Sequence, residues 1–345
     1  MGCYSKAALM SGELVLTDIL RYFVPVLSST ELKRGPVPIR VANVEYVLFR
    51  DNAGRVGALR DRCPHRWTPL SIGKVIPAGR LQCAYHGWHF GTDGDGCSPS
   101  QPNLTGCDVA SLQAVERHDY IWVANPGVSP DSIGEMEWEG FCPANRRCFV
   151  FPAPVHVTLA NLGDTEHGPY VHGKNLIDEL TLLKLELQME RSEDEVAVTT
   201  RNPILHKFLA PLLGARNCDS VQTEIIYRYD PLRVMFTIGW LHSLTGKFAP
   251  SMSRAVFYIV PESDTVTRVH SFTFVSGGKS YLWRLLAQAY DAAFYRRLFK
   301  EDIKIVKATA HMPLDTKGMR LGKHDRGLSA VLSLLKKHYA TPPET

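Results

Sequence analysis

Four residues in "CPHRWTPLSIGKVIPAGRLQCAYHGWHF" have the types and spacing of metal ligands. Cys63 and His65 form one pair, and Cys83 and His86 form a second, with 17 residues between His65 and Cys83. Each pair offers one thiolate and one imidazole. This suits an asymmetric [2Fe–2S] cluster with cysteines on one iron and histidines on the other, whose potential is raised to roughly −150 to +300 mV. Ligand count alone also allows a zinc site, although zinc ligands usually come as C-x₂₋₄-C and H-x₃₋₅-H pairs.

The two loops resemble those of Rieske proteins in the stretches "CPHR", "PLSIG" and "CAYHGWHF". Within that family, the respiratory type has an extra cysteine in each loop, and these two cysteines form a disulfide. Here Tyr85 stands in the second loop where that cysteine would be, and the first loop has none. The resemblance therefore indicates the oxygenase type, with one departure at Trp67, where oxygenases commonly have glycine.

A second pair of histidines, His167 and His172, lies downstream in "NLGDTEHGPYVHGKN". On an unbroken helix, five residues correspond to a rotation of roughly 140°, so the two rings would point apart. Gly168-Pro169 lies between them and disrupts helices. Either the two histidines are unrelated, or the chain bends at Gly168-Pro169 and brings both rings to one point.

With Asp164, these histidines form a D-x₂-H-x₄-H pattern that resembles the ligand segment of Rieske non-haem iron oxygenases. The resemblance implies a mononuclear Fe(II) ion held by two histidines and one carboxylate. In this family the carboxylate often comes from a Glu-Asp pair on the C-terminal helix, here Glu301-Asp302. We select Asp302 ahead of Glu301, and regard Asp291 and Asp315 as weaker candidates.

Two further residues of this segment are site candidates. Asp164 lies three residues before His167, on the same helix face, and is placed to accept the other ring N–H of His167. In the family the corresponding aspartate also links, across a subunit boundary, to a cluster histidine, which here would be His86. Electrons would then cross between subunits of a head-to-tail homotrimer. Asn161, one turn earlier, either lies near the iron or packs in the core.

The elements that must position these residues form two domains. Residues 36–125 are rich in short strands and Gly-containing turns, including a hairpin around "DNAGR". An acidic, proline-containing stretch at 125–140 indicates a linker. Beyond it, a short helical segment at 155–180 precedes long strands between 183 and 275, and an amphipathic helix is predicted at 280–311.

The predicted fold class is therefore α+β. Residues 1–130 would hold an N-terminal segment and an all-β Rieske [2Fe–2S] domain, with its core at about 36–125. Residues 131–345 would form the catalytic mononuclear non-haem iron domain, an antiparallel sheet covered by helices of the helix-grip, START-like kind.

Composition excludes several other classes. A net charge of +4 over 345 residues is too small and too scattered for a nucleic-acid-binding surface. No stretch approaches the roughly 18–20 apolar residues of a membrane span. Eight cysteines without a secretory signal favour a reduced, cytoplasmic protein.

By resemblance, the chain is expected to be the terminal oxygenase (α subunit) of the compact α₃ monooxygenase or demethylase type. It would use O₂ to hydroxylate or O-/N-demethylate a small aromatic or polycyclic substrate. Ring cis-dihydroxylation is the neighbouring expectation. A Rieske electron carrier or redox sensor without a working mononuclear iron is the alternative from another class, and a zinc-stabilised ligand-binding protein is a third.

The sequence contains no flavin or nicotinamide fingerprint and no plant-type ferredoxin motif. Electrons from NAD(P)H would therefore arrive through a separate reductase, with or without a ferredoxin. Three basic residues near the cluster loops, Arg62, Arg66 and Lys74, form a hypothetical surface for an acidic ferredoxin.

Overall fold

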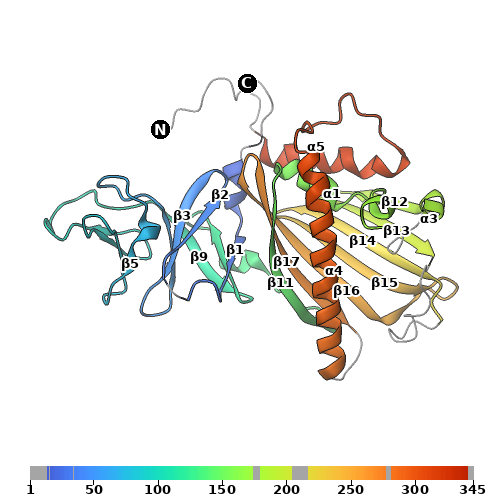
Figure 1. Ribbon diagram of the computed structural model, residues 1–345, viewed down its shortest axis with the longest axis horizontal. Coiled ribbons are helices and arrows are strands. Elements are labelled where there is room, and N and C mark those ends of the chain that lie inside the picture. Colours follow the sequence, from blue (N-terminus) through green and yellow to red (C-terminus); the bar gives the residue numbers. More distant parts are fainter. Residues whose placement is uncertain are drawn as a thin grey trace. The chain divides into compact units, whose positions relative to one another are not determined.

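The computed structural model describes residues 14, 16–33, 35–173, 179–203, 217–276 and 281–340. The chain divides into two compact units (Figure 1). The first unit covers Leu16–Met136 together with Val260–Asp264. The second unit covers Glu137–Ile259 and continues from Thr265.

The first unit is built from antiparallel strands. Six strands form a sheet in the order β1-β10-β9-β4-β3-β2, and four short strands form a second sheet in the order β5-β6-β7-β8. The strands are β1 (Val24–Ser28), β2 (Val37–Val41), β3 (Val44–Arg50), β4 (Val56–Arg60), β5 (Lys74–Val75), β6 (Leu81–Gln82), β7 (His89–Phe90), β8 (Gly96–Cys97), β9 (Ser111–Arg117) and β10 (Tyr120–Ala124). The hairpin predicted around "DNAGR" is confirmed, since β3 and β4 pair with Arg50 opposite Val56.

The hydrophobic core of this unit extends to the predicted cluster ligands. Side chains of β3 and β4, among them Phe49 and Leu59, pack with Leu81 and Phe90 from the small sheet. Cys63 belongs to the same buried cluster, as does Cys83. Both cysteines stand in loops, but their side chains are buried in this core.

The second unit is an antiparallel sheet of seven strands in the order β11-β17-β16-β15-β14-β13-β12. The strands are β11 (Phe141–Phe151), β12 (Glu186–Arg191), β13 (Glu195–Pro203), β14 (Ser220–Tyr229), β15 (Leu232–His242), β16 (Lys247–Ser263) and β17 (Val266–Ser276). The helices are α1 (Val155–Leu162), α2 (Gly168–Val171), α3 (Glu179–Leu183), α4 (Tyr281–Ala308) and α5 (Arg326–Tyr339). Helix α4 packs across β11 and β17, while α5 packs on β12, β13 and β14. The predicted α+β fold, with a β domain followed by a helix-covered antiparallel sheet, is confirmed.

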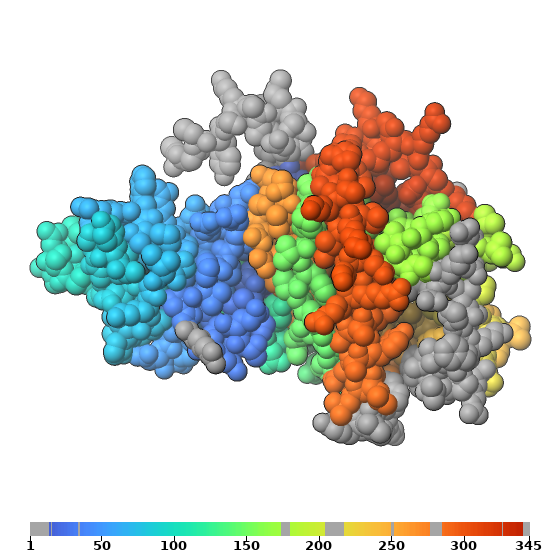
Figure 2. All heavy atoms as spheres, viewed as in Figure 1, coloured from blue at the N-terminus to red at the C-terminus, as the bar shows by residue number. Residues whose placement is uncertain are grey.

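Helix α4 carries the predicted carboxylate pair. Its buried positions recur every three or four residues: Asp291, Tyr295, Phe299, Asp302 and Val306. The first part of the helix departs from the predicted amphipathic pattern, because Leu285, Leu286 and Tyr290 are exposed. Figure 2 shows α4 as a ridge on the face of the second unit that is turned toward the viewer. Among the described residues, none of the helices combines the length and apolarity needed to cross a bilayer.

Candidate metal centres

Two loops of the first unit carry the predicted cluster ligands, and their backbones follow one pattern. Cys63 comes shortly after β4, and Cys83 directly after β6. In each loop the cysteine N–H donates to the carbonyl five residues later, Thr68 at 2.9 Å and Trp88 at 2.7 Å. The two loops therefore present their ligands from matching turns.

The residue four positions after each cysteine closes the turn. Its conformation shows why oxygenases commonly have glycine where this chain has Trp67. Trp67 N–H donates to the Cys63 carbonyl at 2.8 Å, and Gly87 N–H donates to the Cys83 carbonyl at 3.2 Å. Both residues are left-handed, with φ of 60° and 73°. Glycine adopts the left-handed conformation at little cost, whereas a residue with a Cβ atom is strained in it. Trp67 nevertheless occupies it, with 68% of its surface exposed and the Arg62 guanidinium 3.8 Å from its ring centroid.

The four side chains separate into a buried sulfur side and an exposed nitrogen side. Cys63 and Cys83 are each 2% exposed and form no disulfide. His65 and His86 lie at the surface, with ring centroids 4.5 Å apart. Burial and the adjacent Cys83 thiol raise the pKa of Cys63 to about 11, so a metal must replace its proton on binding. This donor set fits an asymmetric cluster with thiolate ligands on the inner iron and imidazoles on the outer one.

The second unit places His167 and His172 at the two ends of one helical turn. His167 is the N-cap of α2, and His172 is its C-cap. The prediction of a bend at Gly168-Pro169 is wrong in position: α1 ends at Leu162, and the break lies before His167. Proline is tolerated in a first helical turn because its missing N–H would have no partner there. Gly168-Pro169 thus starts a helix instead of breaking one.

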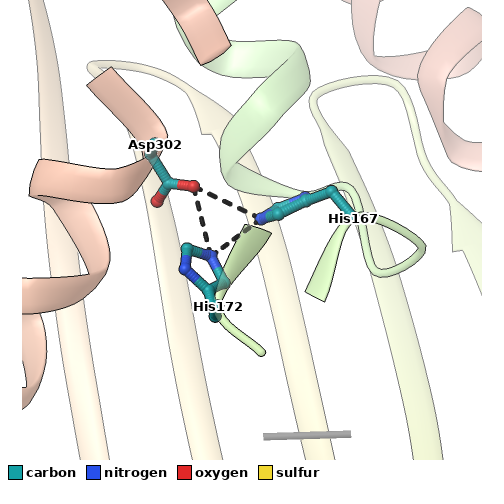
Figure 3. A group of neighbouring side chains, drawn as sticks. All are labelled: His167, His172 and Asp302. Atoms are coloured by element: carbon teal, nitrogen blue, oxygen red, sulfur yellow. Dashed lines mark hydrogen bonds and ion pairs between the residues drawn. The ribbon is translucent and has the colours of Figure 1, made fainter. Parts of the chain in front are cut away.

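The imidazoles meet a carboxylate from α4 (Figure 3). Nε2 of His167 lies 3.0 Å from Nε2 of His172. Asp302 Oδ1 lies 3.4 Å from the first nitrogen and 3.2 Å from the second. With metal–ligand bonds of about 2.1 Å at right angles, adjacent ligand atoms would be about 3.0 Å apart. The three atoms are therefore spaced like neighbouring corners around one ion.

Burial strengthens the case for a cation at this point. Asp302 is 2% exposed, and its Oδ1 faces the two imidazole nitrogens without a hydrogen bond of good geometry to either. A buried carboxylate oxygen in this position is costly unless a positive charge compensates it. The residues fit a divalent ion bound by two nitrogens and one oxygen, a set typical of non-haem Fe(II).

The same contacts set the charges of the site. Burial alone lowers the pKa of His167, but the carboxylates of Asp164 and Asp302 raise it to about 9. The pKa of His172 is also raised, by Asp302 and Glu301 against the effect of burial. Burial raises the pKa of Asp302, but the two imidazoles lower it by more, so the net shift is downward. Protons and a metal ion would therefore compete for the same lone pairs.

Of the other sequence candidates, Asp164 and Glu301 lie next to the triangle. Asp164 Oδ2 is 3.2 Å from His167 Nδ1. Glu301 Oε2 is 3.0 Å from His172 Nδ1, on the far side of that ring from Asp302. The weaker candidates lie elsewhere: Asp291 accepts from Asn145 at 2.8 Å and Thr273 at 2.5 Å, and Asp315 faces Lys336 at 3.9 Å.

Asn161 stands in the last turn of α1. Its Oδ1 is buried and has no hydrogen-bond partner within the described part of the chain. A buried amide oxygen without a partner loses free energy that a bound ligand or water can recover. Asn161 lies three residues before Asp164, and its role toward the iron stays a prediction.

The close contact between Gly163 and Tyr227 was not predicted from the sequence. A Cβ atom on Gly163 would lie 0.9 Å from Tyr227 Oη, so no larger residue fits between α1 and β14. The backbone of Gly163 has an ordinary φ of −112°, which means that close approach is what requires glycine here. Tyr227 is 3% exposed and fixes the path of the chain into Asp164. A lone glycine beside a motif gives no signal of such a contact.

Comparison with known proteins gives the family of the chain. The Rieske [2Fe-2S] domain family matches residues 22–111. The oxygenase subunit of vanillate O-demethylase from a Pseudomonas species is 30% identical over 260 residues, which cover 68% of this chain and 71% of that protein. Chlorophyllide a oxygenase of Chlamydomonas reinhardtii is 33% identical over 180 residues, but these are 49% of this chain and only 28% of that longer protein.

A solved structure shares the fold. Dicamba monooxygenase bound to 3,6-dichlorosalicylic acid superimposes with a TM-score of 0.76 at 21% identity, over 93% of this chain and 97% of that one. At this identity the likeness establishes the fold alone, whereas the vanillate O-demethylase subunit establishes descent over most of both chains. The chain belongs to the Rieske non-haem iron oxygenases, as a terminal oxygenase component.

Proposed function

We propose that this oxygenase inserts one atom of O₂ into a small aromatic or polycyclic substrate, by C–H hydroxylation or by O- or N-demethylation. Its mononuclear iron would be held by His167, His172 and Asp302, and its cluster by Cys63, His65, Cys83 and His86. The carrying observation is the buried triangle of two Nε2 atoms and one carboxylate oxygen, with edges of 3.0 to 3.4 Å.

When bound, iron held by His167, His172 and Asp302 would supply open positions for O₂ reduction, and the cluster held by the two Cys/His pairs would supply single electrons. The balance is substrate C–H plus O₂, two electrons and two protons, giving C–OH and water. On a methyl group attached to oxygen or nitrogen, the same hydroxylation yields an unstable hemiacetal-type product that releases formaldehyde. The protein's own task is to hold the ligands. Asp164, whose Oδ2 lies 3.2 Å from His167 Nδ1, would keep the proton of His167 on that nitrogen, so that Nε2 stays free.

The names of the relatives support this substrate class. One is named for removal of an O-methyl group from vanillate and the other for oxygenation of chlorophyllide a. Demethylation of a methoxy-substituted aromatic ring is therefore the first reaction to test, and cis-dihydroxylation of the ring is the second. The buried, unpartnered amide oxygen of Asn161 supports a role for this residue toward a bound ligand.

We place the electron path between subunits of a homotrimer, from His86 of one subunit to Asp164 of the next. Both groups are accessible in their own units: His86 is exposed, and the Asp164 side chain is 39% exposed. Asp164 Oδ2 contacts His167, and Oδ1 accepts from the Glu166 N–H at 2.7 Å. A neighbour's cluster histidine that donates to this exposed carboxylate as well would complete the link to the iron.

Metal analysis tests the proposal against a Rieske electron carrier or sensor. Anaerobically reconstituted protein should hold three irons and two acid-labile sulfides per chain, because the triangle binds one iron beyond the cluster. Plasma emission spectrometry and sulfide assay give both numbers. Two irons with two sulfides would leave only the carrier, and zinc without sulfide would leave a zinc-stabilised protein.

We further propose that an acidic ferredoxin, or its reductase, docks at the basic residues around the cluster loops and brings electrons from NAD(P)H in the cytoplasm. Arg62, Arg66 and Lys74 are all exposed and would attract a negatively charged carrier. Electrostatic steering of this kind raises association rates by about 10- to 1,000-fold and weakens with salt.

Reversal of these charges should therefore slow cluster reduction. The triple variant Arg62→Glu/Arg66→Glu/Lys74→Glu is expected to lower the second-order rate of cluster reduction by ferredoxin by about tenfold or more at low salt. Stopped-flow absorbance measures the rate. Lys247→Glu, an exposed lysine of the second unit, is the matched control, and dithionite reduction should be unchanged in all variants. An unchanged ferredoxin rate in the triple variant would rule out this docking surface.

A further inference from the structure

Each imidazole of the triangle has a carboxylate on its outer nitrogen. For His167 this is Asp164. For His172 it is Glu301, whose Oε2 lies 3.0 Å from Nδ1. Because Nδ1 and Nε2 lie on different sides of the ring, Glu301 faces away from the point where the ligand atoms meet. We infer that Glu301 is a positioning residue for the iron site, which fixes the tautomer and the orientation of His172. This inference rests on the proposed iron ligands.

The order Glu301-Asp302 gives the two carboxylates different directions. Consecutive residues on a helix are about 100° apart around its axis. Asp302 lies in the buried stripe of α4 at 2% exposure, whereas the Glu301 side chain is 27% exposed. One helix can therefore supply both a ligand beside Nε2 and an acceptor beside Nδ1 of the same histidine. In the sequence analysis Glu301 was the rival of Asp302 as an iron ligand. In the structure Glu301 contacts Nδ1 of His172, whereas Asp302 lies beside Nε2.

A third residue holds the Glu301 carboxylate. Arg297, one turn earlier on α4, donates through Nε to Glu301 Oε1 at 3.1 Å, while Oε2 is left for His172. The Arg297 side chain is 65% exposed, and exposed ion pairs contribute little. Arg297 therefore limits the rotamers of Glu301, and its loss should matter much less than the loss of the carboxylate itself.

A hydrogen bond from Nδ1–H to a carboxylate has two consequences for a ligand histidine. It keeps the proton off Nε2, and it raises the basicity of that nitrogen toward a metal. It also fixes the ring plane, so that Nε2 stays near its 3.2 Å separation from Asp302 Oδ1. Removal of such a partner typically lowers metal affinity by about 10- to 100-fold.

The test measures Fe(II) affinity, independently of any substrate. Full-length protein with its cluster intact is titrated with Fe(II) against a chromogenic ferrous chelator, and the nitric oxide adduct of the site is recorded by electron paramagnetic resonance. Glu301→Leu should weaken Fe(II) binding about 10- to 100-fold and broaden the adduct signal. Glu301→Gln, which keeps an acceptor oxygen, should recover most of the affinity, and Lys300→Ala, an exposed neighbour, should match the wild type.

The outcomes separate this inference from the proposed function. Equal Fe(II) affinity of Glu301→Leu and wild type, when His167→Ala has lost binding, would overturn the role of Glu301 alone. An equal loss in Glu301→Leu and Glu301→Gln would also overturn it, because an acceptor would then not be the property that matters. Wild-type protein that binds no iron beyond the cluster would instead overturn the proposed ligands.

Discussion

Replacement of His167 by alanine is expected to abolish oxygen insertion and to leave the Rieske cluster intact. The substitution removes one of three ligand atoms, so Asp302 Oδ1 and His172 Nε2 alone must hold the ion. Product formation should fall by at least about 10³-fold, as when a group required for the chemical step is lost. The cluster ligands lie in the other compact unit, so its absorbance should be unchanged. Chromatography of a methoxybenzoate substrate and metal analysis measure the two effects.

Iron content makes this prediction independent of the choice of substrate. The variant should retain two irons and two sulfides where the wild type holds three irons and two sulfides. His311→Ala, at an exposed histidine, controls for the loss of an imidazole and should keep the third iron. A His167→Ala protein with three irons would exclude His167 as a ligand. Loss of the cluster as well would mean that the second unit supports the fold of the first.

Local spacing was sufficient for the ligand types but not for their geometry. The two Cys/His pairs are short-range patterns, and each lies within one turn that the sequence already defines. His167 and His172 are also local, yet the sequence placed the bend at Gly168-Pro169, where the structure begins helix α2. Proline ends a helix from its interior and fits its first turn equally well. Only the preceding chain direction distinguishes these two cases.

Contacts between distant segments explain what the sequence could not provide. Asp302 meets His167 only because α4 packs beside α2, and the choice of Asp302 over Glu301 came from family resemblance. The clash that keeps residue 163 a glycine involves Tyr227, more than sixty residues away. Likewise, no local pattern marks Val260–Asp264 as part of the first compact unit. Such contacts depend on tertiary packing, which hydrophobic periodicity and secondary-structure propensity do not predict.

Mixed assemblies of two inactive variants should recover oxygenase activity. His86→Ala removes a cluster ligand and keeps the iron triangle, whereas His167→Ala removes an iron ligand and keeps the cluster. If electrons cross between subunits, an intact cluster of one subunit can serve the intact triangle of the next. In a head-to-tail ring of three that contains both variants, about one of every three subunit junctions pairs the two intact centres in the required order. Turnover of the purified mixed trimers should therefore reach about a third of the wild-type value.

Differently tagged subunits, co-expressed and purified through both tags, provide the mixed assemblies, and each variant purified alone is the matched control. Size-exclusion chromatography with light scattering gives the subunit number. Activity in the mixture but in neither control requires transfer across a subunit boundary, because no single chain then holds both centres. Mixed assemblies with correct iron and sulfide content but no turnover would mean that electrons travel within one chain. In that case the exposed carboxylate of Asp164 would position His167 of its own chain and would accept no hydrogen bond from a histidine of a neighbouring subunit.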